Sequence, residues 1–127
     1  IYNNSSADIS MVNTIVAGNT LNGAESNLKI HSGYKSKFAN CFFGLADEAS
    51  GCVESRSGDP KFVDAAKNDY HLDEGSIAIG AGVTYEGIGT DLDNVKFAAT
   101  PSIGCYELGG TPPEPQPQVD GASVLLY

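Results

Sequence analysis

The feature that most constrains the fold is an internal repeat with a spacing of 27 residues. The segment "MVNTIVAG" (residues 11–18) matches the segment "FANCFFGL" (residues 38–45). In this alignment Asn13 falls on Asn40, and apolar Ile15 and Val16 fall on apolar Phe42 and Phe43. Self-similarity at a fixed period is typical of folds in which successive turns of chain stack on one another. The repeat therefore predicts that residues 27 positions apart lie side by side.

Between the two copies, "SNLKIHSG" alternates apolar Leu28 and Ile30 with polar residues. A period of two is typical of a half-buried β-strand. Asn suits the corners between such strands, because it tolerates a left-handed backbone and its stacked copies can hydrogen-bond from one turn to the next. The pattern predicts an all-β chain, in which no stretch of the repeat reads convincingly as a helix, with rungs of a parallel β-helix in residues 1–57; a β-sandwich is the alternative. The side chains expected to fill the interior are Phe38, Phe42 and Phe43.

The charge balance limits the partners of the chain. Sixteen acidic residues against seven basic ones give a net charge of −9, which repels nucleic acid and anionic membrane surfaces. The same field opposes a uronic-acid polysaccharide unless local Lys residues or Ca²⁺ reverse it. No apolar run approaches the 18 or so residues that a membrane span needs, so no span is predicted.

The composition changes abruptly near the C-terminus. Residues 109–118, "GGTPPEPQPQ", contain four prolines and indicate an extended linker. Residues 119–127, "VDGASVLLY", are again apolar and form a short tail. This tail is interpreted either as a strand that docks onto the preceding domain or as the remnant of a further module.

The stretch from residue 58 to residue 108 carries five short motifs in a fixed order. They are Asp59-Pro60-x-Phe62-Val63-Asp64, Asp69-Tyr70-x-Leu72, Gly75-Ser76-x-Ala78-Ile79-x-x-Gly82, Asp91-Leu92-Asp93-Asn94 and Ile103-Gly104-Cys105-Tyr106-Glu107. In order and spacing they resemble the C-terminal segment of secreted bacterial right-handed parallel β-helix proteins. This pectate-lyase-like group is often labelled choice-of-anchor domain proteins.

The resemblance implies that residues 58–108 form an irregular cap over the C-terminal end of a right-handed β-helix. Such an end otherwise exposes apolar side chains and unpaired backbone groups. The apolar cover is expected from Phe62, Val63, Tyr70, Leu72, Ile77 and Ile79. The acceptors for backbone N–H groups at the turns are expected to be Asp59, Asp64, Asp69 and Ser76. Cys105 stands where the family has Ala, which predicts a small, buried and unpaired thiol.

Asp91 and Asp93 are the candidate metal ligands. Two carboxylates one residue apart, together with carbonyl groups of the turn, could hold a Ca²⁺ ion. Asx turns, in which the side chain accepts a nearby backbone N–H, explain the same residues. No other cofactor is predicted.

The three cysteines show no zinc-site spacing. Cys41 and Cys52 could form a disulfide across a polar loop, and the alternative is a pair of small buried thiols. The two histidines, His31 and His71, lie in alternating patterns and are expected at the surface. No nucleophile-elbow motif supports a Ser/His/Asp triad built on either of them.

A basic cluster near Tyr34 is the candidate sugar-binding surface. Tyr34 could stack on a sugar ring, and the cations could pair with uronates or act as lyase bases. A solvated charged face is the alternative. The basic residues concerned are Lys29, Lys35, Lys37 and Arg56.

These observations predict a non-catalytic C-terminal capping module of a secreted or surface-anchored bacterial β-helix protein that acts on or binds polysaccharide. No catalytic residue is predicted in this chain. The expected partners are polysaccharide, upstream turns of the β-helix and, for the isolated chain, a second copy meeting it end to end. The alternatives are the stalk of an adhesin or glycan-binding protein and a polysaccharide lyase with its site in this chain.

Overall fold

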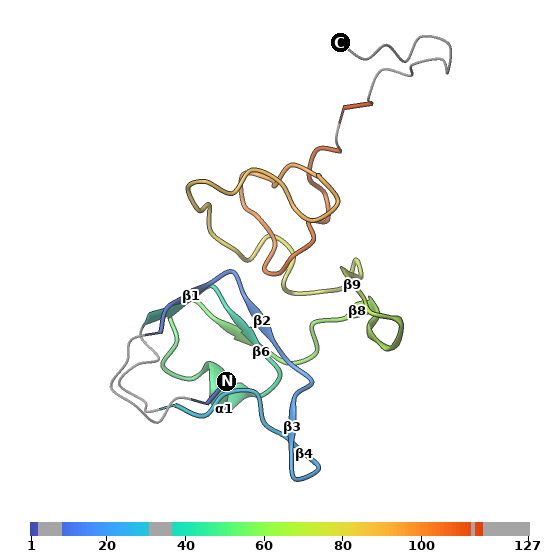
Figure 1. Cartoon of the computed structure of the whole chain (residues 1–127). Coiled ribbons are helices and arrows are strands. Elements are labelled where there is room, and N and C mark those ends of the chain that lie inside the picture. Colours follow the sequence, from blue (N-terminus) through green and yellow to red (C-terminus); the bar gives the residue numbers. More distant parts are fainter. Residues whose placement is uncertain (3–8, 31–36, 113, 116–127) are drawn as a thin grey trace, which may run out of the picture.

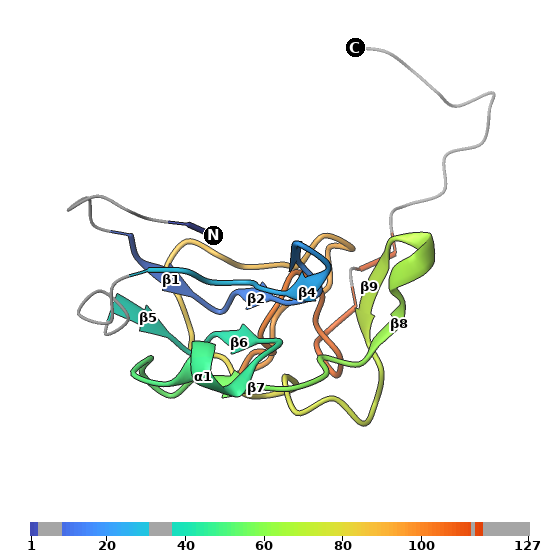
Figure 2. The same ribbon diagram turned by 90° about the horizontal axis from the view of Figure 1, so that it is seen from below.

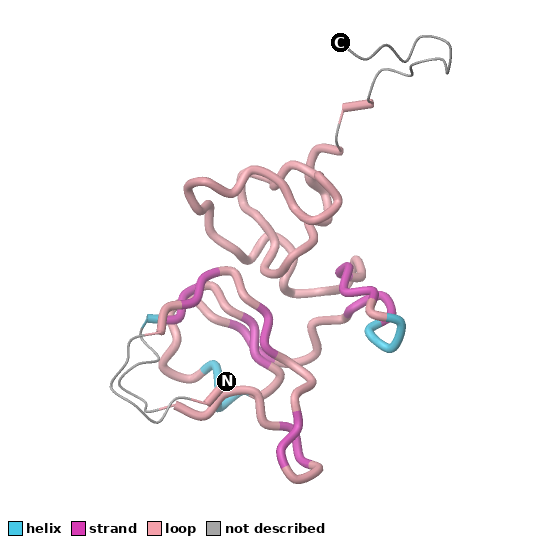
Figure 3. Tube along the Cα trace, viewed as in Figure 1, coloured by secondary structure: helices cyan, strands magenta, loops and turns pink. Residues whose placement is uncertain are grey.

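The computed structural model describes residues 1–2, 9–30, 37–112 and 114–115 (Figure 1). The fold is β-rich, with small sheets and little helix, as Figure 3 shows. No helix in the described part is long and apolar enough to cross a membrane. The strands are β1 (Met11–Val12), β2 (Ile15–Val16), β3 (Thr20–Leu21), β4 (Ala24–Glu25), β5 (Phe38–Ala39), β6 (Phe42–Phe43), β7 (Arg56–Ser57), β8 (Phe62–Asp64) and β9 (Asp69–Leu72); the helices are α1 (Ala46–Ala49) and the 3₁₀ helix η2 (Ala65–Lys67).

Residues 1–57 contain turns of chain stacked in parallel. Strand β1 pairs with β5, and β2 pairs with β6 in the register Ile15↔Phe42. A third parallel contact joins Tyr2 to Lys29 at the same offset of 27 positions. The repeat seen in the sequence is therefore the pairing register, and that prediction is confirmed.

The corners between the paired strands have left-handed backbones, as expected for Asn. Asn13 has a φ of 52° and Asn40 a φ of 51°. A third turn, which the sequence analysis missed, adds β7 alongside β6, and Figure 2 shows β2, β6 and β7 in that order. Glu54, with a φ of 46°, occupies its corner. This turn was missed because it is much shorter than 27 residues and carries no Asn at the corner.

The short third turn contains α1, a single helical turn that the repeat pattern did not predict. Helix α1 carries Glu48, which is 6% exposed. Its carboxylate accepts the backbone N–H groups of Asn27 (2.6 Å) and Leu28 (3.0 Å) and the side-chain amide of Asn27 (2.8 Å). Burial opposes ionisation, but these hydrogen bonds outweigh it and hold the Glu48 pKa below its usual range. One helical turn thus fixes the preceding turn of chain.

Two apolar cores lie on opposite faces of the parallel strands. The first fills the inside of the stacked turns with Val16, Leu28, Phe38, Cys41 and Phe43. The second lies outside and joins Phe42 to Leu72, Ala78, Ala81 and Ile103. Adjacent residues of a strand point to opposite faces, so Phe43 faces inward and Phe42 outward. The prediction that Phe42 fills the interior was therefore wrong.

Residues 73–112 form irregular loops that pack against the side of the stacked turns (Figure 1). The Asn13 side chain donates to the Val83 carbonyl (2.6 Å) and accepts the Val83 N–H (2.9 Å), and Asn40 donates to the Ala81 carbonyl (3.2 Å). Gly82 lies between these contacts, where a Cβ atom would come within 2.8 Å of the Pro101 carbonyl oxygen. The two corner asparagines therefore bind the C-terminal loops through these bonds.

The apolar cover expected from the resemblance is only partly formed. Phe62, Leu72 and Ile79 pack in the outer core. Val63, Tyr70 and Ile77 are 56%, 42% and 57% exposed, contrary to expectation. On the antiparallel hairpin of β8 and β9, Val63 faces away from the core because its neighbour Phe62 faces toward it. Tyr70 packs edge-on against Phe62, with ring centroids 5.3 Å apart, but stays partly exposed. Ile77 lies outside the hairpin.

The turn acceptors follow the expectation at three of four positions. Asp59 accepts the Lys61 N–H (2.8 Å), Asp69 accepts the His71 N–H (3.2 Å), and Ser76 accepts the Ala78 N–H (3.2 Å). Asp64 instead forms an ion pair with Lys67 (2.8 Å).

Candidate functional site

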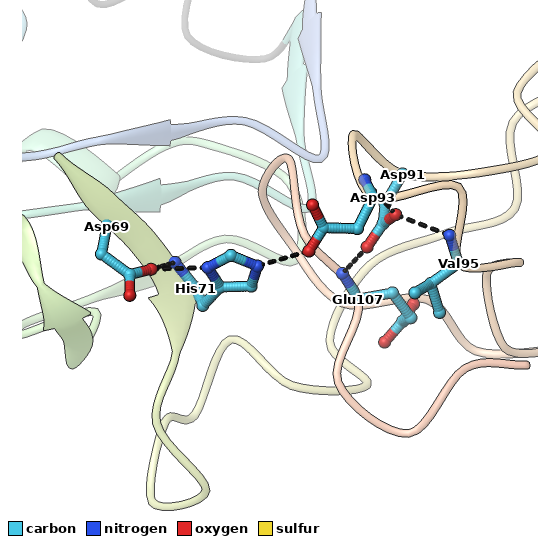
Figure 4. Close-up of polar contacts among 6 residues, drawn as sticks. All are labelled: Asp69, His71, Asp91, Asp93, Val95 and Glu107. Carbon is cyan, nitrogen blue, oxygen red and sulfur yellow. Dashed lines mark hydrogen bonds and ion pairs between the residues drawn. The ribbon is translucent and has the colours of Figure 1, made fainter. Parts of the chain in front are cut away.

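A polar cluster outside the stacked turns centres on His71 (Figure 4). Strand β9 places Asp69 and His71 on one face, because residues two apart in a strand point the same way. The His71 Nδ1 lies 2.5 Å from Asp69 Oδ1, and the Nε2 lies 2.6 Å from Asp93 Oδ2. The imidazole thus joins the hairpin to the turn that follows Asp91.

The surroundings of His71 favour its protonated form. The hydrogen bond to Asp93, followed by the one to Asp69, raises the pKa of His71. The hydrogen bond between His71 and Asp69 in turn lowers the pKa of Asp69. The ring stacks on Tyr106, with centroids 3.8 Å apart and an interplanar angle of 21°. A cation held between two carboxylates and an aromatic face is an electrostatic clamp.

This arrangement does not suit acid–base catalysis. A general base needs a ring nitrogen that can reach a substrate proton, and both nitrogens of His71 are already engaged. No serine hydroxyl in the part of the chain that the structure describes bonds to this ring. Sequence reasoning placed His71 at the surface, where its side chain is 44% exposed, but did not foresee its two acidic partners.

The two candidate calcium ligands lie in one turn but point to different partners (Figure 4). Asp91 Oδ1 accepts the N–H groups of Asp93 and Val95, both at 2.8 Å, and its Oδ2 accepts the Glu107 N–H at 2.8 Å. Asp93 bonds to His71. Asp91 therefore has the Asx-turn role. Among the described residues no group of three or more His, Cys, Asp or Glu side chains is arranged to hold a metal ion.

The basic cluster is described only in part. Lys29, Lys37 and Arg56 are exposed. Tyr34, Lys35 and His31 lie outside the described residues, so no sugar-binding surface can be assembled around Tyr34 from the structure.

The cysteines form no disulfide within the described residues. The Cys41 thiol is buried and donates to the Ala39 carbonyl (3.4 Å), while the Cys52 thiol donates to the Glu48 carbonyl (3.5 Å). Burial raises the pKa of Cys41. Cys105 is exposed, so the prediction that it is buried was wrong.

The described residues form a cleft of about 530 Å³ between the Asn13 corner and the loops of residues 83–105. This volume falls within the range of roughly 300–1,000 Å³ typical of ligand sites. Four apolar side chains in its lining are well exposed: Val83, Tyr85, Ile88 and Leu92. Sequence reasoning missed the cleft, because it is assembled from loops without strand periodicity.

Comparisons with known proteins assign no family to this arrangement. No family model matches the chain, and neither the curated proteins nor the solved structures yielded a significant match.

Proposed function

We propose that residues 1–57 are the last rungs of a right-handed parallel β-helix and that residues 58–108 are its non-catalytic cap. The observation that carries the proposal is the recurrence of one offset, 27 positions, at three separate parallel contacts. A chain wound into stacked turns brings successive turns together at a fixed period. The following turn is shorter, and its parallel contacts Phe42↔Arg56 and Ala39↔Val53 share an offset of 14 positions. The motifs between Asp59 and Glu107 support the assignment of the cap.

The contacts of residues 58–108 extend the proposal beyond what the resemblance implies. The cap covers the outward face that carries Phe42, and it binds the corners through Asn13 and Asn40. A cap held along the side of the β-helix protects an apolar face that neighbouring chains could otherwise bind.

The parent protein, in this proposal, is secreted or displayed on a bacterial surface and acts on or binds polysaccharide. Upstream rungs would stack on β1 and β2, whose outer edges carry no partner strand within the described residues. Catalysis by this chain is not expected, because the imidazole of His71, the histidine within the described residues, uses both ring nitrogens internally.

The proposal is tested in two steps. Backbone NOEs between Ile15 and Phe42 and between Met11 and Phe38 are expected if the turns stack in parallel; antiparallel cross-peaks would contradict the β-helix. Incubation with pectin, alginate, chondroitin sulfate and heparin should produce no new unsaturated ends by ultraviolet absorbance. Product that disappears in the His71→Ala variant would instead assign a lyase activity to this chain.

A further inference from the structure

The cleft beside the Asn13 corner is lined by several exposed apolar side chains. Val83, Tyr85, Ile88 and Leu92 are 42%, 56%, 58% and 70% exposed, and all four line the cleft. Scattered exposed apolar residues are normal, but several gathered in one cleft indicate a binding site for an apolar segment.

The path of the chain points to the occupant. Thr111 pairs with Lys96, donating its N–H to the Lys96 carbonyl (3.0 Å) and accepting the Lys96 N–H (2.7 Å). Lys96 itself lines the cleft. The chain therefore leaves the described loops at the wall of the cleft.

The sequence beyond this point has the composition that the cleft requires. Residues 119–127 have six apolar side chains and one charged side chain, Asp120, which is opposite in sign to Lys96 at the wall. Residues 112–122 span roughly 34 Å at the polyproline rise of about 3.1 Å per residue, which is enough to lead back to the cleft.

We propose that the cleft binds the apolar C-terminal segment of the same chain, Val124–Tyr127. A second copy is the weaker alternative, because two chains that each carry a net charge of −9 repel one another. A tethered segment, by contrast, is present at an effective concentration in the millimolar range. The segment after the linker is thus a ligand of the loops and covers their exposed apolar side chains.

Cys105 allows a direct test, because it is exposed and lines the cleft. In the 127-residue chain carrying Cys52→Ser, a second cysteine is introduced by Ser123→Cys, which keeps all the apolar side chains. The matched control is Gln116→Cys. Under mild oxidation, disulfide formation with Cys105 is followed by peptide mass spectrometry.

A freely moving chain would join Cys105 to position 116 faster than to position 123, because the shorter loop is easier to close. Docking reverses this order, and we expect position 123 to react about ten-fold faster than position 116. Equal rates, a faster reaction at 116, no disulfide at either position, or predominantly intermolecular disulfides would each overturn the proposal.

A cleft variant completes the test. Leu92→Asp changes a side chain that is 70% exposed, so folding should be unaffected, and an unchanged circular dichroism spectrum would verify this. We expect this variant to slow the reaction at position 123 by about five-fold and to leave the reaction at position 116 unchanged, because only the docked segment contacts Leu92. A reaction rate at position 123 that does not change in the Leu92→Asp variant would contradict docking in this cleft.

Discussion

The stacked turns of residues 1–57 and the loops of residues 73–112 satisfy their backbone groups in different ways. In the stacked turns, parallel strands bond to one another at a regular offset. In the loops, much of this role falls to buried side chains: Asp91 accepts three backbone N–H groups, and Glu107 accepts the N–H and the hydroxyl of Ser102. A regular ladder tolerates substitution of its side chains, whereas the loops depend on individual carboxylates.

The largest effect is expected where the two regions meet. Phe42 is fully buried between them, so Phe42→Ala should lower the free energy of unfolding by about 3–5 kcal/mol. Chemical denaturation measures this loss. Val63→Ala, at a side chain that is 56% exposed on the nearby hairpin, is the control and should change stability by less than about 0.5 kcal/mol. Similar losses in both variants would show that the loops do not pack on this face.

The dependence of the loops on single carboxylates is tested at Asp91. Asp91→Ala leaves three backbone N–H groups without their acceptor and should cost about 3 kcal/mol. Hydrogen exchange should accelerate at Val95 and Glu107 while the amide of Phe42 in the stacked turns stays protected. Uniform acceleration throughout the chain would mean that the two regions unfold as one unit.

Glu48 is the exception in the stacked turns, where one carboxylate supports the ladder. Glu48→Gln should cost about 1–3 kcal/mol at neutral pH, because the amide replaces only one of the acceptor oxygens. The pKa of Glu48 is lower in the folded state than in the unfolded state, where it is about 4.3. Ionised Glu48 therefore stabilises the fold above the unfolded-state pKa, and this stabilisation is lost as the pH falls through the folded-state pKa. Thermal melts of the two proteins should therefore converge below about pH 4; a constant difference would contradict the anionic role.

The smallest effect is expected at the His71 clamp, which is partly exposed. Its folded-state pKa is raised, so the stabilisation is fully present below the unfolded value of about 6.5 and is lost as the pH rises through the folded pKa. His71→Asn should therefore lower the melting temperature more at about pH 5.5 than at about pH 8.5. Lys67→Gln, which breaks the exposed ion pair with Asp64, should show no such pH dependence. A larger loss for His71→Asn at the higher pH would reverse the assigned sign.

The sequence alone determined the register of β1 with β5 and of β2 with β6, but not that of the shorter third turn. The match of Asn13 with Asn40 is a local signal, because a left-handed corner restricts the residue that occupies it, and a repeat brings equivalent corners together. The acceptor roles of Asp59, Asp69 and Ser76 were equally readable, since each bonds to the backbone only two residues further on.

Only the tertiary structure decided which residues far apart in the sequence come into contact. Phe42 faces the loops and Phe43 the interior. The sequence alternation places these two side chains on opposite faces of the strand, but it does not specify which face the loops will cover. The pairing of His71 with Asp93, 22 positions away, and the apolar cleft arise where loops without periodicity meet. Short-range preferences fix corners and turns because they act within a few residues, but the choice among long-range contacts depends on the packing of the whole chain.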